Sequence, residues 1–98
     1  MIAAITLDSR PVGNPAFARQ DDAEGWTALV NLDRPAGVAL NATGMMVWDG
    51  IDGKRTVAEI ITELRDRFAD APPTLSEDVL AILEILREVG LIGYEVEL

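Results

Sequence analysis

The sequence has 98 residues and contains neither cysteine nor histidine. The lack of cysteine excludes disulfide bonds, zinc sites built from thiolates and a thiol nucleophile. The lack of histidine removes the commonest general base and the commonest metal ligand. A small enzyme of this composition would depend on a pair of carboxylates, and the sequence does not place such a pair. We therefore predict a protein that is not an enzyme and that uses no cofactor and no metal.

Long apolar runs are lacking too. No run approaches the roughly 20 residues that a membrane span requires. The first residues carry neither the basic region nor the long apolar region of a secretory signal. We expect a soluble protein of the cytoplasm with no membrane partner.

Basic residues are few. Eight Lys and Arg stand against seventeen Asp and Glu, which gives a net charge of −9. This charge repels the phosphate backbone of nucleic acids, so we predict no nucleic-acid partner. The acidic clusters have two interpretations, a solvated surface or the steering of a basic peptide or a basic patch on a partner enzyme.

The apolar fraction of 49% and the charged fraction of 26% are those of one ordinary globular domain. Residues 1–15 contain Pro11 and Pro15, which argue against a central strand or a helix there. We predict an N-terminal arm, with room for a short strand, over residues 1–15 and a single domain over residues 16–98.

Three extended segments open the domain. They cover residues 16–20, 27–32 and 37–40, and turn-forming residues separate them at 21–25 and 33–36. Apolar side chains alternate along the second and third segments, so we predict a small antiparallel sheet.

Two helices are predicted next. The first covers residues 44–52, with Asn41 or Thr43 as its N-cap and Gly53 at its end. The second begins at the Thr-Val-Ala-Glu motif of residues 56–59, a capping box in which two side chains bond reciprocal backbone N–H groups.

A third helix is predicted over residues 75–89. The Thr-Leu-Ser-Glu motif of residues 74–77 offers another capping box, with Ser76 as a competing cap. Leu80 and Arg87 lie together on one flank of this helix, outside its apolar arc. The inward-facing arc is predicted to contain Val79, Ile82, Leu83, Ile85, Leu86 and Val89.

Asp78 falls within that apolar arc. Three interpretations stay open for its carboxylate. It accepts free backbone N–H groups in the first turn, it pairs with Arg19 or Arg55, or it contacts a partner.

Three strands followed by three helices predict an α+β fold with a winged helix-turn-helix outline. Such folds often bind DNA through the third helix, so a winged-helix transcriptional regulator is the alternative function. The third helix carries Glu77, Asp78, Glu84 and Glu88 against Arg87 alone, which disfavours DNA recognition. An extended peptide fits better, because it can add to the edge of a small sheet.

Two motifs carry a resemblance to a known family. The first is Leu-Asn-x-Thr-Gly at residues 40–44, and the second is Asp-Gly-x-Arg-Thr-Val-x-Glu-Ile at residues 52–60. Together with the segment Leu-Arg-Glu-Val-Gly-Leu-Ile at residues 86–92, they make residues 16–92 resemble the PqqD-type modules, also called RiPP recognition elements.

The resemblance implies a function and a site. These modules bind the leader segment of a ribosomally synthesised precursor peptide along the third strand and the third helix, and present it to a modifying enzyme. That enzyme would be a radical S-adenosylmethionine enzyme in pyrroloquinoline quinone (PQQ) biosynthesis or a leader peptidase in lasso-peptide biosynthesis, and the motifs fit both. By position, the implied binding residues are Val38, Ala39, Leu40, Leu80, Leu83, Glu84 and Arg87, of which Leu83 is also a core candidate.

Overall fold

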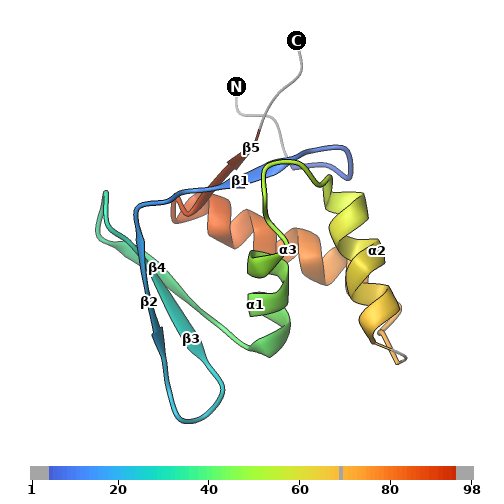
Figure 1. Ribbon diagram of the computed structural model, residues 1–98, viewed down its shortest axis with the longest axis horizontal. Coiled ribbons are helices and arrows are strands. Elements are labelled where there is room, and N and C mark those ends of the chain that lie inside the picture. The colour runs from blue at the N-terminus through green and yellow to red at the C-terminus, as the bar shows by residue number, and fades with distance from the viewer. Residues whose placement is uncertain (1–4, 69, 95–98) are drawn as a thin grey trace.

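A three-stranded antiparallel sheet stands beside three helices in this computed structural model, which describes residues 5–68 and 70–94 (Figure 1). The predicted α+β class is therefore confirmed. In chain order the elements are β1 (Pro11–Gly13), β2 (Phe17–Asp21), β3 (Thr27–Asn31), β4 (Ala36–Leu40), α1 (Ala42–Asp49), α2 (Val57–Arg67), α3 (Leu75–Glu88) and β5 (Ile92–Tyr94).

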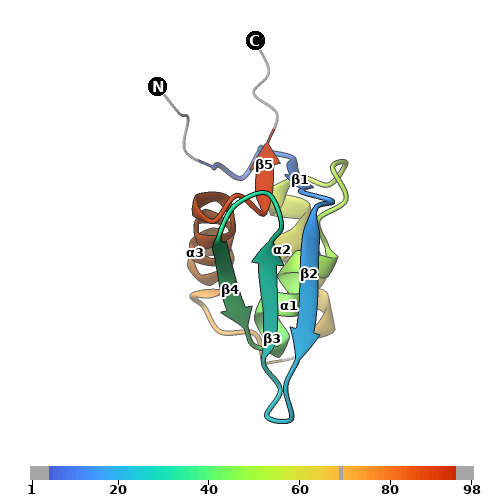
Figure 2. The same cartoon turned by 90° about the vertical axis from the view of Figure 1, so that its left-hand side faces the viewer.

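The sheet has the order β2-β3-β4, and each predicted strand is confirmed to within a residue at either end. Alternation sets its two faces. Thr27, Leu29 and Asn31 of β3 are buried, whereas Val30 is 44% exposed on the opposite face. The buried side chains face the helices, and Figure 2 shows the sheet standing in front of them.

The first helix begins and ends earlier than predicted. Asn41 is its N-cap, and the Asn41 side chain accepts a hydrogen bond from the Gly44 N–H at 2.9 Å. The predicted end at Gly53 is wrong, because the helix ends at Asp49 and Gly50 caps it. Gly53 instead has a φ of +77° in the next turn, a conformation that favours glycine.

The capping box at the start of α2 is confirmed. The Glu59 N–H donates to Thr56 Oγ1 at 3.2 Å, and the Thr56 N–H donates to Glu59 Oε1 at 3.0 Å. The second predicted box is wrong. Thr74 is the N-cap residue of α3, but its hydroxyl bonds the Asp78 carboxylate at 3.2 Å and caps no backbone N–H.

Residues 5–13 lie against the domain. β1 pairs with β5 in antiparallel fashion, which confirms the short strand, and Ile5 is buried among the core residues. The Val57 and Ala58 N–H groups at the start of α2 donate to the carbonyls of Ser9 and Leu7. The division into an arm and a domain stays a prediction, since residues 1–4 lie outside the described part.

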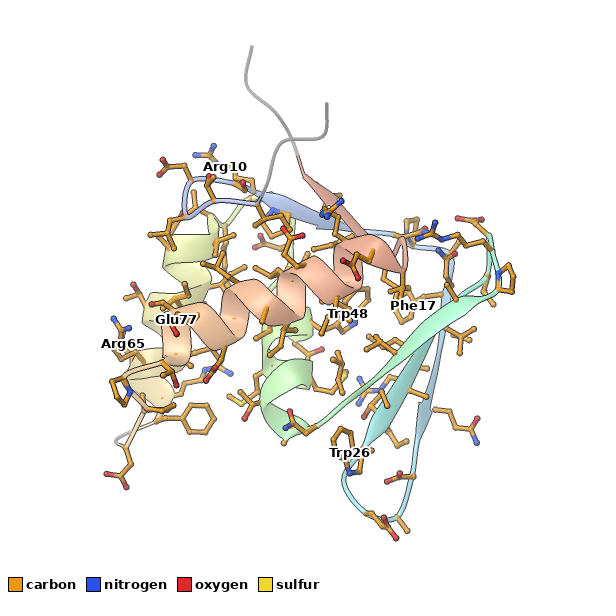
Figure 3. The ribbon with its side chains drawn as sticks, turned by 180° about the vertical axis from the view of Figure 1, so that it is seen from behind. Arg10, Phe17, Trp26, Trp48, Arg65 and Glu77 are labelled. Carbon is orange, nitrogen blue, oxygen red and sulfur yellow. The ribbon has the colours of Figure 1, made fainter. Side chains whose placement is uncertain are left out.

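The core lies between the sheet and the helices. Phe17 of β2 meets Trp48 of α1 edge to face, with ring centroids 5.1 Å apart (Figure 3). Val79, Leu83 and Leu86 of α3 are fully buried, as predicted. Ile85 was predicted to face inward and is 45% exposed, because it lies about 100° round the helix from Leu86.

Candidate functional site

The outer edge of β4 is open in the sheet that the described residues form. The Asp22 N–H donates to the Trp26 carbonyl and the Leu32 N–H donates to the Ala16 carbonyl, both at 2.9 Å. In the β2–β3 register these bonds join even-numbered residues, so the even-numbered residues of β3 bond to β2. The odd-numbered residues of β3 therefore bond to β4.

This alternation decides which groups of β4 face outward. The β4 partners of the odd-numbered β3 residues are Ala36, Val38 and Leu40. Gly37 and Ala39 lie between them, so their backbone N–H and C=O groups point away from β3. The edge of β4 thus presents hydrogen-bond donors and acceptors to an incoming strand.

Helix α3 lies behind β4 at this edge of the sheet (Figure 2). At one end, the Asn31 side-chain amide and the Arg34 guanidinium donate to the Val89 carbonyl at 2.9 and 3.3 Å, which joins the β3–β4 turn to the end of α3. At the other end, Asn41 lines a pocket together with Ile82. The two elements therefore lie next to each other between the β3–β4 turn and Asn41, and we call the surface between them the groove.

The wall that α3 contributes to the groove is apolar. Ile82, Ile85 and Val89 follow one another at a spacing of three and four residues, which places them on one flank of the helix. Ile82 and Val89 are half-buried, and Ile85 is among the exposed large apolar residues. On β4, the side chain of Val38 is half-buried against the core.

The groove leads into an open pocket of about 510 Å³. Its walls come from the start of α1, the α2–α3 connection and the first half of α3. Phe68, Leu75 and Ile82 supply apolar surface, while Asp70 and Asp78 supply carboxylates.

The structure brings only some of the predicted binding residues to the groove. Val38, Ala39 and Leu40 belong to β4, although the Leu40 side chain is buried and only 6% exposed. Ala39 contributes its backbone edge. Leu83 is fully buried, so its side chain has no surface to offer a peptide.

Leu80, Glu84 and Arg87 lie on the other flank of α3. The Ile5 N–H donates to Glu84 Oε1 at 3.3 Å, so this flank faces the N-terminal segment. Arg87 Nη2 donates to Glu84 Oε2 at 2.8 Å, and this bond is the main reason why the pKa of Glu84 lies below its usual value. The binding role predicted for Leu80, Glu84 and Arg87 is untested, and the groove runs along the opposite flank of α3.

Sequence reasoning missed the flank that carries Ile85. The helical wheel places Ile82, Ile85 and Val89 in an apolar arc, and the sequence predicts that the whole arc faces the core. The available signal was the width of the arc, since a buried stripe and an apolar groove wall can lie next to each other on one helix.

The described residues 5–68 and 70–94 contain no group of three or more acidic side chains placed to hold a metal ion. In the same part of the chain, no helix has the length and apolar character needed to cross a membrane.

The fold and the groove define a class of small α+β modules that present an open strand edge beside a helix, a geometry that suits the capture of extended chains. The family model "Coenzyme PQQ synthesis protein D (PqqD)" matches residues 27–92. The chain therefore belongs to the PqqD family, and the resemblance seen in the sequence is confirmed.

Two similar proteins agree with this assignment. The "PqqA binding protein" of Pseudomonas aeruginosa (strain UCBPP-PA14) is 42% identical over 82 residues, which cover 82% of this chain and 85% of that protein. The "PqqA binding protein 2" of Pseudomonas putida (strain KT2440) is 46% identical over 50 residues. These residues cover 51% of this chain and 54% of that protein, which is about half of its length.

A solved structure described as "TbiB1 in Complex with the TbiA(beta) Leader Peptide" has the same fold. The TM-score is 0.67 over 88% of this chain and 99% of that chain, at 17% sequence identity. At this identity the likeness shows the fold alone.

Proposed function

We propose that this protein binds the leader segment of a ribosomally synthesised precursor peptide as an added strand on β4. The observation that carries the proposal is the open edge at Gly37 and Ala39, which faces the apolar flank of α3 across the groove. Backbone bonds to the edge would give affinity, and alternate side chains against Ile82, Ile85 and Val89 would give specificity. The two relatives are named as proteins that bind PqqA, and these names support the proposal.

The proposed role is delivery of the peptide and not catalysis. Holding the leader next to a modifying enzyme raises the effective concentration of the precursor. We propose a radical S-adenosylmethionine enzyme as that partner if the pathway makes PQQ, and a leader peptidase if it makes a lasso peptide. The cytoplasm is the proposed location, because ribosomes supply precursor peptides there. We also propose the winged helix-turn-helix description of the fold, on the order of its strands and helices.

A calorimetric titration with the precursor peptide PqqA tests the proposal. We expect saturable one-to-one binding, with no binding to a duplex DNA run alongside. Ile85→Asp should raise Kd about tenfold or more, since burying an isoleucine is worth about 1.5–3 kcal/mol. Val30→Asp is the matched control, because Val30 is equally exposed on the outer face of the sheet.

Two further variants locate the bound strand. Ala39→Pro removes an N–H that points away from β3, so it should weaken the peptide without breaking the β3–β4 ladder. Arg87→Glu changes the other flank of α3 and should leave Kd within about twofold. Loss of binding in Arg87→Glu with full binding in Ile85→Asp would place the peptide on the flank of Leu80 and Glu84 instead.

A further inference from the structure

The pocket at the end of the groove is lined by carboxylates as well as by apolar side chains. It continues the peptide path, because Asn41 directly follows β4 and Ile82 belongs to the groove wall. Its volume of about 510 Å³ can hold a long side chain. A peptide strand on β4 would therefore place a flanking residue at its mouth.

The lining of the pocket combines apolar surface with negative charge. Phe68 is 37% exposed, and Leu75 and Ile82 extend the apolar wall. Asp70 and Asp78 supply carboxylates, and both are exposed.

The carboxylates that line the pocket outnumber its cations. Arg67 is the only cation among the described residues that line it, and Arg67 pairs with Glu63 at 3.3 Å. The carboxylates of Asp70 and Asp78 therefore leave the pocket with a negative excess.

Asp78 is the carboxylate that α3 contributes to the pocket. Two partners considered for it from the sequence are engaged elsewhere, since Arg19 pairs with Asp21 at 3.2 Å and Arg55 pairs with Glu63 at 2.7 Å. Its Oδ2 accepts the Thr74 hydroxyl at 3.2 Å, which orients the carboxylate without neutralising it. Asp78 also lies in the first turn of α3, where the helix dipole favours a negative charge, and its carboxylate remains available to a partner in the pocket.

We infer that this pocket receives a lysine or arginine side chain of the peptide, from a position that flanks the segment paired with β4. The inference rests on the proposed function and adds the chemical class of one peptide residue. The aliphatic stem would lie on Ile82 and the Phe68 ring, and the cation would meet the carboxylates. A net charge of −9 draws a basic peptide toward this surface.

A selection from a displayed library of random 12-residue peptides tests the inference without knowledge of the natural leader. The wild-type protein should select peptides that have an alternating apolar segment and a Lys or Arg at one fixed flanking position. Asp78→Asn is nearly isosteric and keeps an acceptor for the Thr74 hydroxyl, so it should select the same apolar segment without the basic residue. Asp66→Asn, an exposed carboxylate of α2 outside this pocket, is the control and should select as wild type does.

A titration of one selected lysine peptide completes the test. Replacing its lysine by norleucine should weaken binding to the wild-type protein about five- to tenfold and leave binding to Asp78→Asn unchanged. Equal binding of the two peptides to the wild-type protein, or a selection without a basic position, would overturn the pocket assignment while strand binding stands. Failure to select any peptide whose binding depends on Ile85 would overturn the proposed function as well.

Discussion

At the scale of a residue, Gly90 holds the end of α3 against the sheet. Its φ is +77°, and a Cβ added there would lie 2.7 Å from Asn31 Nδ2 and 3.0 Å from Arg34 Nε. Those two side chains donate to the carbonyl of Val89. The close approach that a glycine allows therefore sets the distance between the β3–β4 turn and α3, and with it the width of the groove.

We expect Gly90→Ala to lower the free energy of unfolding by about 2 kcal/mol or more, because it adds a strained φ to a steric clash. Urea unfolding followed by circular dichroism measures this change. Gly93→Ala is the matched control, since Gly93 has no positive φ and nothing lies within 4 Å of its added Cβ. Equal midpoints for the two variants would contradict the account.

At the scale of an element, α2 is stabilised by the capping box at its start. Hydrogen bonds from the backbone and the hydroxyl of Thr56 hold the pKa of Glu59 below its ordinary value of 4.5. The lowered pKa means that the charged form is favoured in the folded protein. The stabilisation is therefore fully present above about pH 4.5 and is lost as the pH falls through the lower pKa of the folded state.

Glu59→Gln should accordingly destabilise the protein more at pH 7 than at pH 3. The amide keeps the hydrogen bond of the capping box but carries no charge for the start of the helix. Urea unfolding at a series of pH values measures the difference between the two proteins. Glu24→Gln, in the exposed β2–β3 turn, is the control, and an identical pH trend for both variants would refute the role of the capping box.

At the scale of the whole molecule, two strands far apart in the sequence lie side by side. β1 and β5 pair with each other, and the two strands lie above α3 in Figure 1. The segment that leads into β1 also supplies acceptors for the first N–H groups of α2, which the helix itself leaves without partners. Residues 5–13 thus hold the helices together through these contacts, on the side of α3 opposite the groove.

Removal of residues 1–10 should lower the free energy of unfolding by about 2–4 kcal/mol. The loss combines the burial of Ile5 with the hydrogen bonds that Leu7 and Ser9 accept. The peptide should still bind the folded fraction with an unchanged Kd, since the groove lies on the other flank of α3. Unfolding and titration of the same sample check both statements. Weaker binding of the peptide together with an unchanged free energy of unfolding would contradict them.

The sequence by itself determined the elements whose signals are local. Alternation and turn residues placed β2, β3 and β4, and the capping box of Thr56 and Glu59 spans only four residues. The motifs at residues 40–44 and 52–60 identified the family for the same reason, because they describe how one element passes into the next.

Only the tertiary structure decided the contacts between distant segments. A helical wheel gives angles between side chains but no absolute direction, so it did not tell which flank of α3 faces β4 and which faces Ile5. The pairing of Pro11 with Tyr94 joins residues at opposite ends of the chain, and no local pattern specifies such a partner. The open edge was expected from the strand count, but its apolar wall at Ile82, Ile85 and Val89 depends on how the packed core orients α3.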